Sequence, residues 1–110
     1  MKKGEIMDMK RFEGQVVAIT GAARGIGTAC AERFAQEGAK IACMDIIDDE
    51  NQAVATKIAD LGVESVAVKI DVTDKASVKA AFDTVVEKWG RIDVLVCSAG
   101  ITTSTPLPEI

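Results

Sequence analysis

The chain lacks two residue types that carry much of enzyme chemistry. None of its 110 residues is a histidine or a tyrosine, and aromatic residues make up only 4%. Without histidine, zinc sites with the usual mixed Cys/His spacing are excluded. The three widely spaced cysteines are therefore expected to be buried, reduced thiols: Cys30, Cys43 and Cys97.

Long apolar runs and clustered positive charge are also missing. No stretch approaches the roughly 18 apolar residues of a membrane helix, and residues 1–14 mix charged and apolar side chains unlike a signal peptide. Lysine and arginine are scattered and the formal net charge is −4, which indicates no surface for DNA or RNA. We expect a cytoplasmic protein without membrane or nucleic-acid partners.

The hydrophobic fraction of 48% is ample for one globular domain. We expect a flexible segment over residues 1–13 and a single domain over residues 14–110. Within that domain, four short apolar runs predict strands at residues 16–20, 40–44, 66–70 and 94–97.

Three amphipathic segments separate these strands and predict helices. Asp48 or Asp49 is expected to cap the second helix, and Thr73 or Asp74 the third, while Gly38, Gly62 and Gly90 mark the three helix ends. The expected buried faces are Ile26, Cys30 and Phe34 in the first helix, Val54, Ile58 and Leu61 in the second, and Val78, Phe82, Val85 and Trp89 in the third.

Strict alternation of strand and helix with short connections predicts an α/β fold, a doubly wound parallel sheet between helix layers. In the usual strand order of such doubly wound sheets, 3-2-1-4, the run at residues 94–97 lies at a sheet edge. That run is nevertheless uniformly apolar, as in strands buried on both faces. We therefore expect the sheet to continue in a further strand and the domain to be truncated at residue 110.

A glycine-rich turn joins the first strand to the first helix. In Gly21-Ala22-Ala23-Arg24-Gly25-Ile26-Gly27, the start of the helix offers free N–H groups to an anion. Gly21 permits the sharp turn, Gly25 the approach of a pyrophosphate, and Gly27 close packing of helix on strand. A tight turn without a ligand would use the same residues.

Asp45 ends the second strand, eighteen residues beyond Gly27. Dinucleotide-binding folds place an acid there to accept hydrogen bonds from the adenosine ribose. A capping or solvated aspartate, in a cluster with Asp48 and Asp49, is the alternative interpretation. The turn and the acid fall where one ligand could span both.

Together these features resemble the short-chain dehydrogenase/reductase family. Thr20 to Gly27 meets its glycine signature TGxxxGxG, Asp71-Val72 follows the third strand, and Cys97 to Gly100 stands where the family usually has Asn-Asn-Ala-Gly. The resemblance runs from about Arg11 to the end. It implies a Rossmann-like NAD(P)-binding domain, and the combined spacing is more specific than any single motif.

The resemblance also implies roles for individual residues. Asp71 would accept a hydrogen bond from the adenine amino group, although it could instead cap the following helix. With Cys97 and Ser98 in place of two asparagines, the side-chain bracing of the central strands should be lost. The implied cofactor-binding residues are Gly21, Arg24, Gly25, Ile26 and Gly27 at the pyrophosphate, Asp45 and Ile46 at the ribose, Asp71 and Val72 at the adenine, and Cys97, Ala99 and Gly100 along the cofactor.

Charge favours NAD over NADP. A carboxylate at Asp45 would repel a 2′-phosphate, and Ile46 and Ile47 offer neither a cation nor a hydroxyl to bind one. Arg24 favours NADP instead, because some NADP-using relatives carry a basic residue there. NADP is therefore the alternative cofactor.

The catalytic residues of the family are not matched in this sequence. Family members transfer hydride between the nicotinamide and a carbonyl or alcohol, using a tyrosine, a lysine four residues later and a serine, none of which is matched here. We expect the cofactor-binding part of an NAD-dependent oxidoreductase, inactive by itself and homo-oligomeric at full length. The alternative is a non-catalytic nucleotide-binding or NAD-sensing module.

Overall fold

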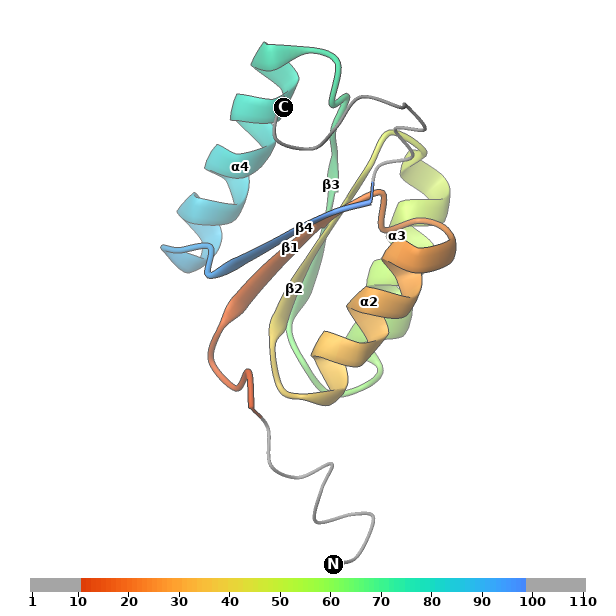
Figure 1. The fold of residues 1–110 in the computed structure, drawn as a ribbon, viewed down its shortest axis with the longest axis vertical. Coiled ribbons are helices and arrows are strands. Elements are labelled where there is room, and N and C mark those ends of the chain that lie inside the picture. The colour runs from red at the N-terminus through yellow and green to blue at the C-terminus, as the bar shows by residue number, and fades with distance from the viewer. Residues whose placement is uncertain (1–10, 99–110) are drawn as a thin grey trace, which may run out of the picture.

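The computed structural model describes residues 11–98 of the chain (Figure 1). The expected flexible segment lies mostly outside this range, as do Ala99 and Gly100. Seven elements follow one another in the described part: β1 (Val16–Thr20), α2 (Gly25–Gln36), β2 (Lys40–Asp45), α3 (Asp48–Ala59), β3 (Ser65–Lys69), α4 (Lys75–Trp89) and β4 (Val94–Cys97). The observed bounds differ from the expected ones by one residue at β2 and β3.

The four strands form one parallel sheet in the order β3-β2-β1-β4, which confirms the predicted fold class. Helices α2 and α3 cover one face and α4 lies on the other, so the chain forms three layers (Figure 1). All strands run the same way, and their carboxyl ends therefore meet at one edge of the sheet. The loops β1–α2, β2–α3 and β3–α4 also leave from that edge.

The central strands are buried because both faces of the sheet carry helices. β1 is buried at every position, and β2 at its four middle residues. β4 is different: its residues alternate, with Val94 and Val96 packed against the α2/α3 core while Leu95 is 48% exposed. The prediction that β4 is buried on both faces is wrong for the described chain, since α4 does not cover Leu95 and Cys97.

Helix α2 presents its small residues to the sheet. Gly27, Ala31 and Ala35 are buried, whereas Ile26 is 75% exposed. The predicted face of Ile26, Cys30 and Phe34 is therefore wrong at Ile26, and the buried face is centred one residue further along the helix. The helix runs so close to β1 that only small side chains fit between them, and Cys30 and Phe34 pack at the flank, partly buried.

Helices α3 and α4 begin differently. Asp74 caps α4 by accepting a hydrogen bond from the amide of Ala76 at 2.9 Å, as one of the two predicted candidates. For α3 the N-cap is Ile47 and no side chain caps it, so the expected cap at Asp48 or Asp49 is wrong. Both acids instead lie in the first turn, where the helix dipole favours negative charge.

The predicted faces of the last two helices hold at their centres. Val54, Ile58 and Val85 are buried. Leu61 is wrong, because it lies beyond the end of α3 and is 47% exposed. On the other face of the sheet, three partly buried residues of α4 pack against the core that contains Val85: Val78, Phe82 and Trp89.

The three cysteines occupy three different environments. Cys43 is buried in β2, and burial raises the pKa of its thiol to about 12. Cys30 is half-buried, and Cys97 at the end of β4 is exposed. The prediction of buried thiols is therefore wrong for Cys97, because the uncovered face of β4 leaves it open to solvent.

A polar side chain lies within the α3 side of the core. Asn51 of α3 is fully buried, and its amide group donates hydrogen bonds to the carbonyl oxygens of Cys43 at 2.8 Å and Val68 at 3.3 Å. It thereby ties the helix to the neighbouring strands β2 and β3. Within residues 11–98, no helix has the length and apolar character needed to cross a membrane.

Candidate functional site

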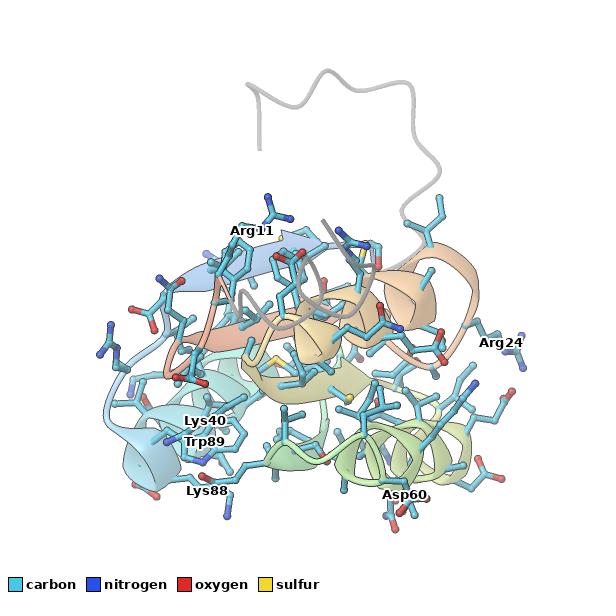
Figure 2. All side chains as sticks on the ribbon, turned by 90° about the horizontal axis from the view of Figure 1, so that it is seen from below. Arg11, Arg24, Lys40, Asp60, Lys88 and Trp89 are labelled. Carbon is cyan, nitrogen blue, oxygen red and sulfur yellow. The ribbon has the colours of Figure 1, made fainter. Side chains whose placement is uncertain are left out.

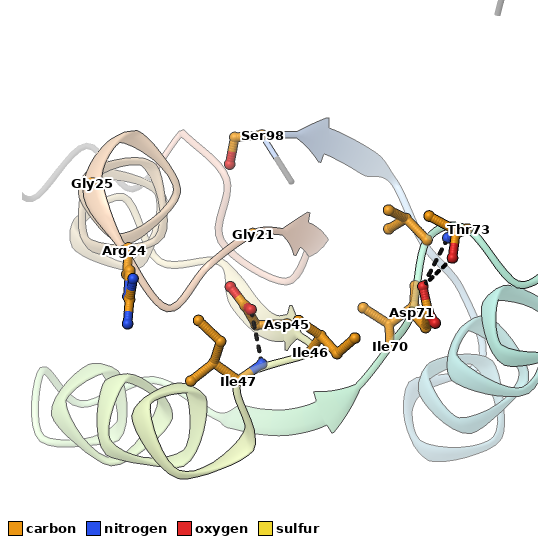
Figure 3. A pocket seen from close by; sticks show the side chains of 11 residues that line it. Gly21, Arg24, Gly25, Asp45, Ile46, Ile47, Ile70, Asp71, Thr73 and Ser98 are labelled. Carbon is orange, nitrogen blue, oxygen red and sulfur yellow. Dashed lines mark hydrogen bonds between the residues drawn. The ribbon is translucent and has the colours of Figure 1, made fainter. Parts of the chain in front are cut away.

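A cleft of about 480 Å³ opens at the carboxyl ends of the strands (Figure 3). This is the edge at which ligands bind in open parallel sheets. The residues that line it come from the ends of β1, β2, β3 and β4 and from the loops that follow: Gly21, Arg24, Gly25, Asp45, Ile46, Ile47, Ile70, Asp71, Val72, Thr73 and Ser98.

The glycine turn is fixed by a close approach between its first and last glycines. Gly21 has φ 74°, in the left-handed region that favours glycine, and its amide donates to the Met44 carbonyl at 2.7 Å. A Cβ at Gly27 would lie 2.0 Å from the Gly21 carbonyl oxygen. Gly27 therefore has the packing role that the sequence predicts for it.

The start of α2 leaves backbone donors without acceptors. Its N-cap Arg24 makes no side-chain cap hydrogen bond, and among residues 11–98 the amides of Gly25, Ile26 and Gly27 meet no acceptor. Gly25 has φ 55°, and a Cβ there would have nothing within 4 Å. The turn thus presents N–H groups and open space, which is the arrangement that binds phosphate oxygens.

Asp45 holds the two loops beside the cleft. One carboxylate oxygen accepts from the amide of Ala23 at 3.0 Å, and the other accepts from the amide of Ile47 at 3.0 Å. Because each carboxylate oxygen has two lone pairs, each retains one for a further donor. Asp45 is therefore both a structural link and an acceptor at the wall of the cleft.

Arg24 reaches away from the glycine turn to α3. Its Nε and Nη2 donate to the two carboxylate oxygens of Glu50, at 3.2 and 2.7 Å. Hydrogen bonding to Glu50 is the main cause that raises the pKa of Arg24, followed by attraction to Glu50, and Asp45 and Asp49 add smaller attractions. The guanidinium side chain is 68% exposed, so this pair lies in water at the rim of the cleft.

Asp71 follows β3 and lies on the side of the cleft opposite Arg24 (Figure 3). Its Oδ1 accepts from both the hydroxyl of Thr73 at 2.6 Å and the amide of Thr73 at 3.0 Å, and these bonds lower the pKa of Asp71. The interpretation of Asp71 as the cap of the next helix is wrong, since Asp74 caps α4. The second oxygen, Oδ2, accepts none of these bonds.

The ends of β1 and β4 are braced by a side chain. The Ser98 hydroxyl donates to the Thr20 carbonyl at 2.8 Å, and the Ser98 amide donates to the same oxygen at 3.1 Å. The prediction that bracing is lost here is therefore wrong. A hydroxyl suffices because β4 pairs in register with β1, which brings Cys97 opposite Thr20 and Ser98 within reach.

The cleft gathers seven of the predicted cofactor-binding residues. They are Gly21, Arg24, Gly25, Asp45, Ile46, Asp71 and Val72. Ile26, Gly27 and Cys97 lie outside the lining, and Ala99 and Gly100 lie outside the described residues.

Four lining residues were not among those predicted: Ile47, Ile70, Thr73 and Ser98. Each directly follows or precedes a predicted site residue or strand end. Their position in the chain was the available signal. Among residues 11–98 there is no group of three His, Cys, Asp or Glu residues suited to a metal ion.

Comparison with known proteins gives the site its family context. The short chain dehydrogenase family matches residues 15–110. A sorbitol dehydrogenase from Cereibacter sphaeroides is 40% identical over 100 residues, which are 91% of this chain and 38% of that protein.

Solved structures give the same result. A hydroxysteroid dehydrogenase from Escherichia coli matches with a TM-score of 0.81 and 33% identity, covering 93% of this chain and 45% of the other. An NAD+-bound xylitol dehydrogenase matches with a TM-score of 0.76 and 36% identity, covering 77% and 33%. The chain spans less than half the length of each of these proteins. From the matched residues and the shared fold, the chain belongs to the short chain dehydrogenase family.

Proposed function

We propose that this chain forms the nicotinamide-dinucleotide site of an oxidoreductase that transfers hydride between the cofactor and an alcohol or carbonyl substrate. One observation carries the proposal. Gly25, whose backbone amide meets no acceptor among the described residues, and the Asp45 carboxylate line the same cleft, as the pyrophosphate and the adjoining adenosine ribose of one dinucleotide require. Similarity to an NAD+-bound xylitol dehydrogenase supports this assignment.

The residues fit the cofactor in distinct ways. The amides of Gly25 and Ile26 would bind the pyrophosphate, because the glycine side of the turn is open. Asp45 would accept hydrogen bonds from the ribose hydroxyls through its remaining lone pairs. Asp71 and Val72 would border the adenine, with Oδ2 of Asp71 accepting from its amino group. The bound nicotinamide would supply the hydride chemistry.

NAD is the proposed cofactor. Asp45 would repel a 2′-phosphate, and Arg24, the one cation among the described residues that line the cleft, is already paired with Glu50. NADP is the alternative cofactor, because the guanidinium of the same arginine is suited to bind a 2′-phosphate.

Binding is tested by calorimetric titration of the protein with NAD and NADP. We expect NAD to bind more tightly, and Asp45→Asn to weaken NAD by about tenfold, as loss of one charge-assisted hydrogen bond predicts. Asp60→Asn, at the exposed end of α3, is the matched control for charge and should leave affinity unchanged. Unchanged NAD affinity in Asp45→Asn, with an unchanged melting temperature, would refute the role of Asp45.

The second candidate function is an NAD-sensing module, which would bind NAD in the same cleft without catalysing hydride transfer. The two functions separate in a turnover assay of the whole protein, because only the oxidoreductase oxidises an alcohol with reduction of NAD.

A further inference from the structure

Glu50, at the rim of the cleft, forms an ion pair with the one cation among the described lining residues. Arg24 is the single Lys or Arg among the described residues that line the cleft, and both of its donating nitrogens face Glu50. Figure 3 shows the Arg24 side chain pointing from the start of α2 towards α3. The bidentate geometry is the one that a guanidinium also uses to bind a phosphate.

Charge around Arg24 is strongly one-sided. Asp48, Asp49 and Glu50 form the first turn of α3, and Asp45 ends β2 just before it. Lys57, the basic residue in the last turn of α3, is paired with Glu32 of α2 at 2.7 Å. A ligand with an additional phosphate at the ribose would therefore meet several carboxylates and one arginine that is already occupied.

We propose that Glu50 is a specificity-determining residue, which selects against a 2′-phosphate by holding the Arg24 guanidinium in a bidentate pair. This rests on the proposed function, since it assumes that a dinucleotide binds in the cleft. Asp45 acts by direct repulsion, whereas Glu50 acts by removing the counter-charge. Cofactor preference thus depends on a residue of α3 as well as on the glycine turn and the end of β2.

The exposure of the pair makes this role separable from stability. The side chains are 68% and 43% exposed, and ion pairs in water contribute little to folding. Glu50→Gln should therefore leave the melting temperature nearly unchanged and release Arg24 to bind phosphate oxygens. We expect NADP affinity to rise by about threefold to fivefold, the free energy of one exposed ion pair, and NAD affinity to stay within about twofold.

Two variants distinguish the pairing from a general charge effect. Asp49→Asn removes the same charge from the adjacent residue, which attracts Arg24 without a hydrogen bond to it. It should change the NADP-to-NAD affinity ratio much less than Glu50→Gln. In the double variant Glu50→Gln with Arg24→Gln, the gain in NADP affinity should disappear.

The experiment is calorimetric titration of the wild-type protein and the three variants with NAD and NADP at fixed salt. A shift in the affinity ratio that needs both Glu50→Gln and Arg24 supports the proposal. An equal shift in Asp49→Asn, or none in Glu50→Gln while wild type binds NAD, overturns it. If wild type binds neither dinucleotide, the proposed function fails and this proposal with it.

Discussion

The two ends of the sheet are built on opposite plans. At the carboxyl end, backbone donors at the start of α2 lack acceptors and a cleft lies open. At the amino end, charged groups pair with one another: Glu37 accepts from both Arg11 and Arg33, and Asp93 accepts from Arg91 and from the amide of Val16. Charged groups at the amino end are thus satisfied within the chain, whereas backbone donors at the carboxyl end are left open to the cleft.

At the amino end of the sheet, the segment before β1 also packs against the end of α2. The Phe12 and Phe34 rings meet edge to face at 4.9 Å between centroids, and the Phe12 amide donates to the Glu37 carbonyl. Lys40 and Trp89 both contact Glu64, and Figure 2 shows them together on one side with Arg24 on the other. Substitutions that change ligand affinity should therefore lie at the carboxyl end, and substitutions at the amino end should change stability alone.

The largest effect is expected where the carboxyl end is most tightly packed. Gly27→Ala would place a Cβ 2.0 Å from the Gly21 carbonyl oxygen, which is backbone and cannot rotate away. We expect it to destabilise the fold by roughly 3 kcal/mol, the upper range for an overpacked site, measured by urea unfolding. Gly25→Ala, with open space but φ 55°, is the control and should cost less, about 1 kcal/mol. Equal stability of Gly27→Ala and wild type would contradict the close approach.

An intermediate effect compares the two ends directly through matched serines. Ser98 donates to Thr20 at the carboxyl end, and Ser65 at the start of β3 donates to the Ala55 carbonyl at 2.6 Å. Replacing either with alanine should cost about 1 kcal/mol of unfolding free energy. Only Ser98→Ala should also weaken NAD, because only Ser98 lines the cleft. The comparison breaks down if Ser65→Ala weakens NAD by as much.

The smallest effect concerns charge at the amino end. Hydrogen bonding from Arg11, and then from Arg33, lowers the pKa of Glu37 below its ordinary value of 4.5. A carboxylate with a lowered pKa stabilises the fold above its ordinary pKa, and that contribution is lost as the pH falls through the folded value. Thermal melting should show Glu37→Gln less stable than wild type at pH 7, and this difference should shrink as the pH falls below 4.5. NAD affinity should not change, and a change would contradict the division of roles.

The sequence was a good guide to the architecture and a weaker one to helix faces. Short apolar runs located all four strands, and the order 3-2-1-4 followed from the usual strand order of dinucleotide-binding folds. Ile26 and Leu61 were expected inside because they are large and apolar. The close approach at Gly27 instead turns small residues to the sheet, and Leu61 falls just past the end of α3. Periodicity cannot reveal how near a helix lies to its sheet.

The candidate site was predicted where backbone geometry dominates and missed where side chains act. Gly21, Gly25 and Asp45 line the cleft because turn chemistry and strand ends fix their places. The pairing of Arg24 with Glu50 and the brace from Ser98 join residues 26 and 78 positions apart. Such contacts depend on register and rotamers, which no local pattern in the chain encodes.

Asp45 has a consequence for solvent exchange. Its two oxygens each hold one amide, Ala23 before α2 and Ile47 before α3. A ligand that competes for these oxygens would loosen both amides together, whereas one that only adds bonds would leave them protected. The rate of deuterium uptake at these two amides therefore shows whether a ligand takes hydrogen bonds of Asp45 from the backbone or adds to them. It can be followed at two backbone positions without any label in the cleft.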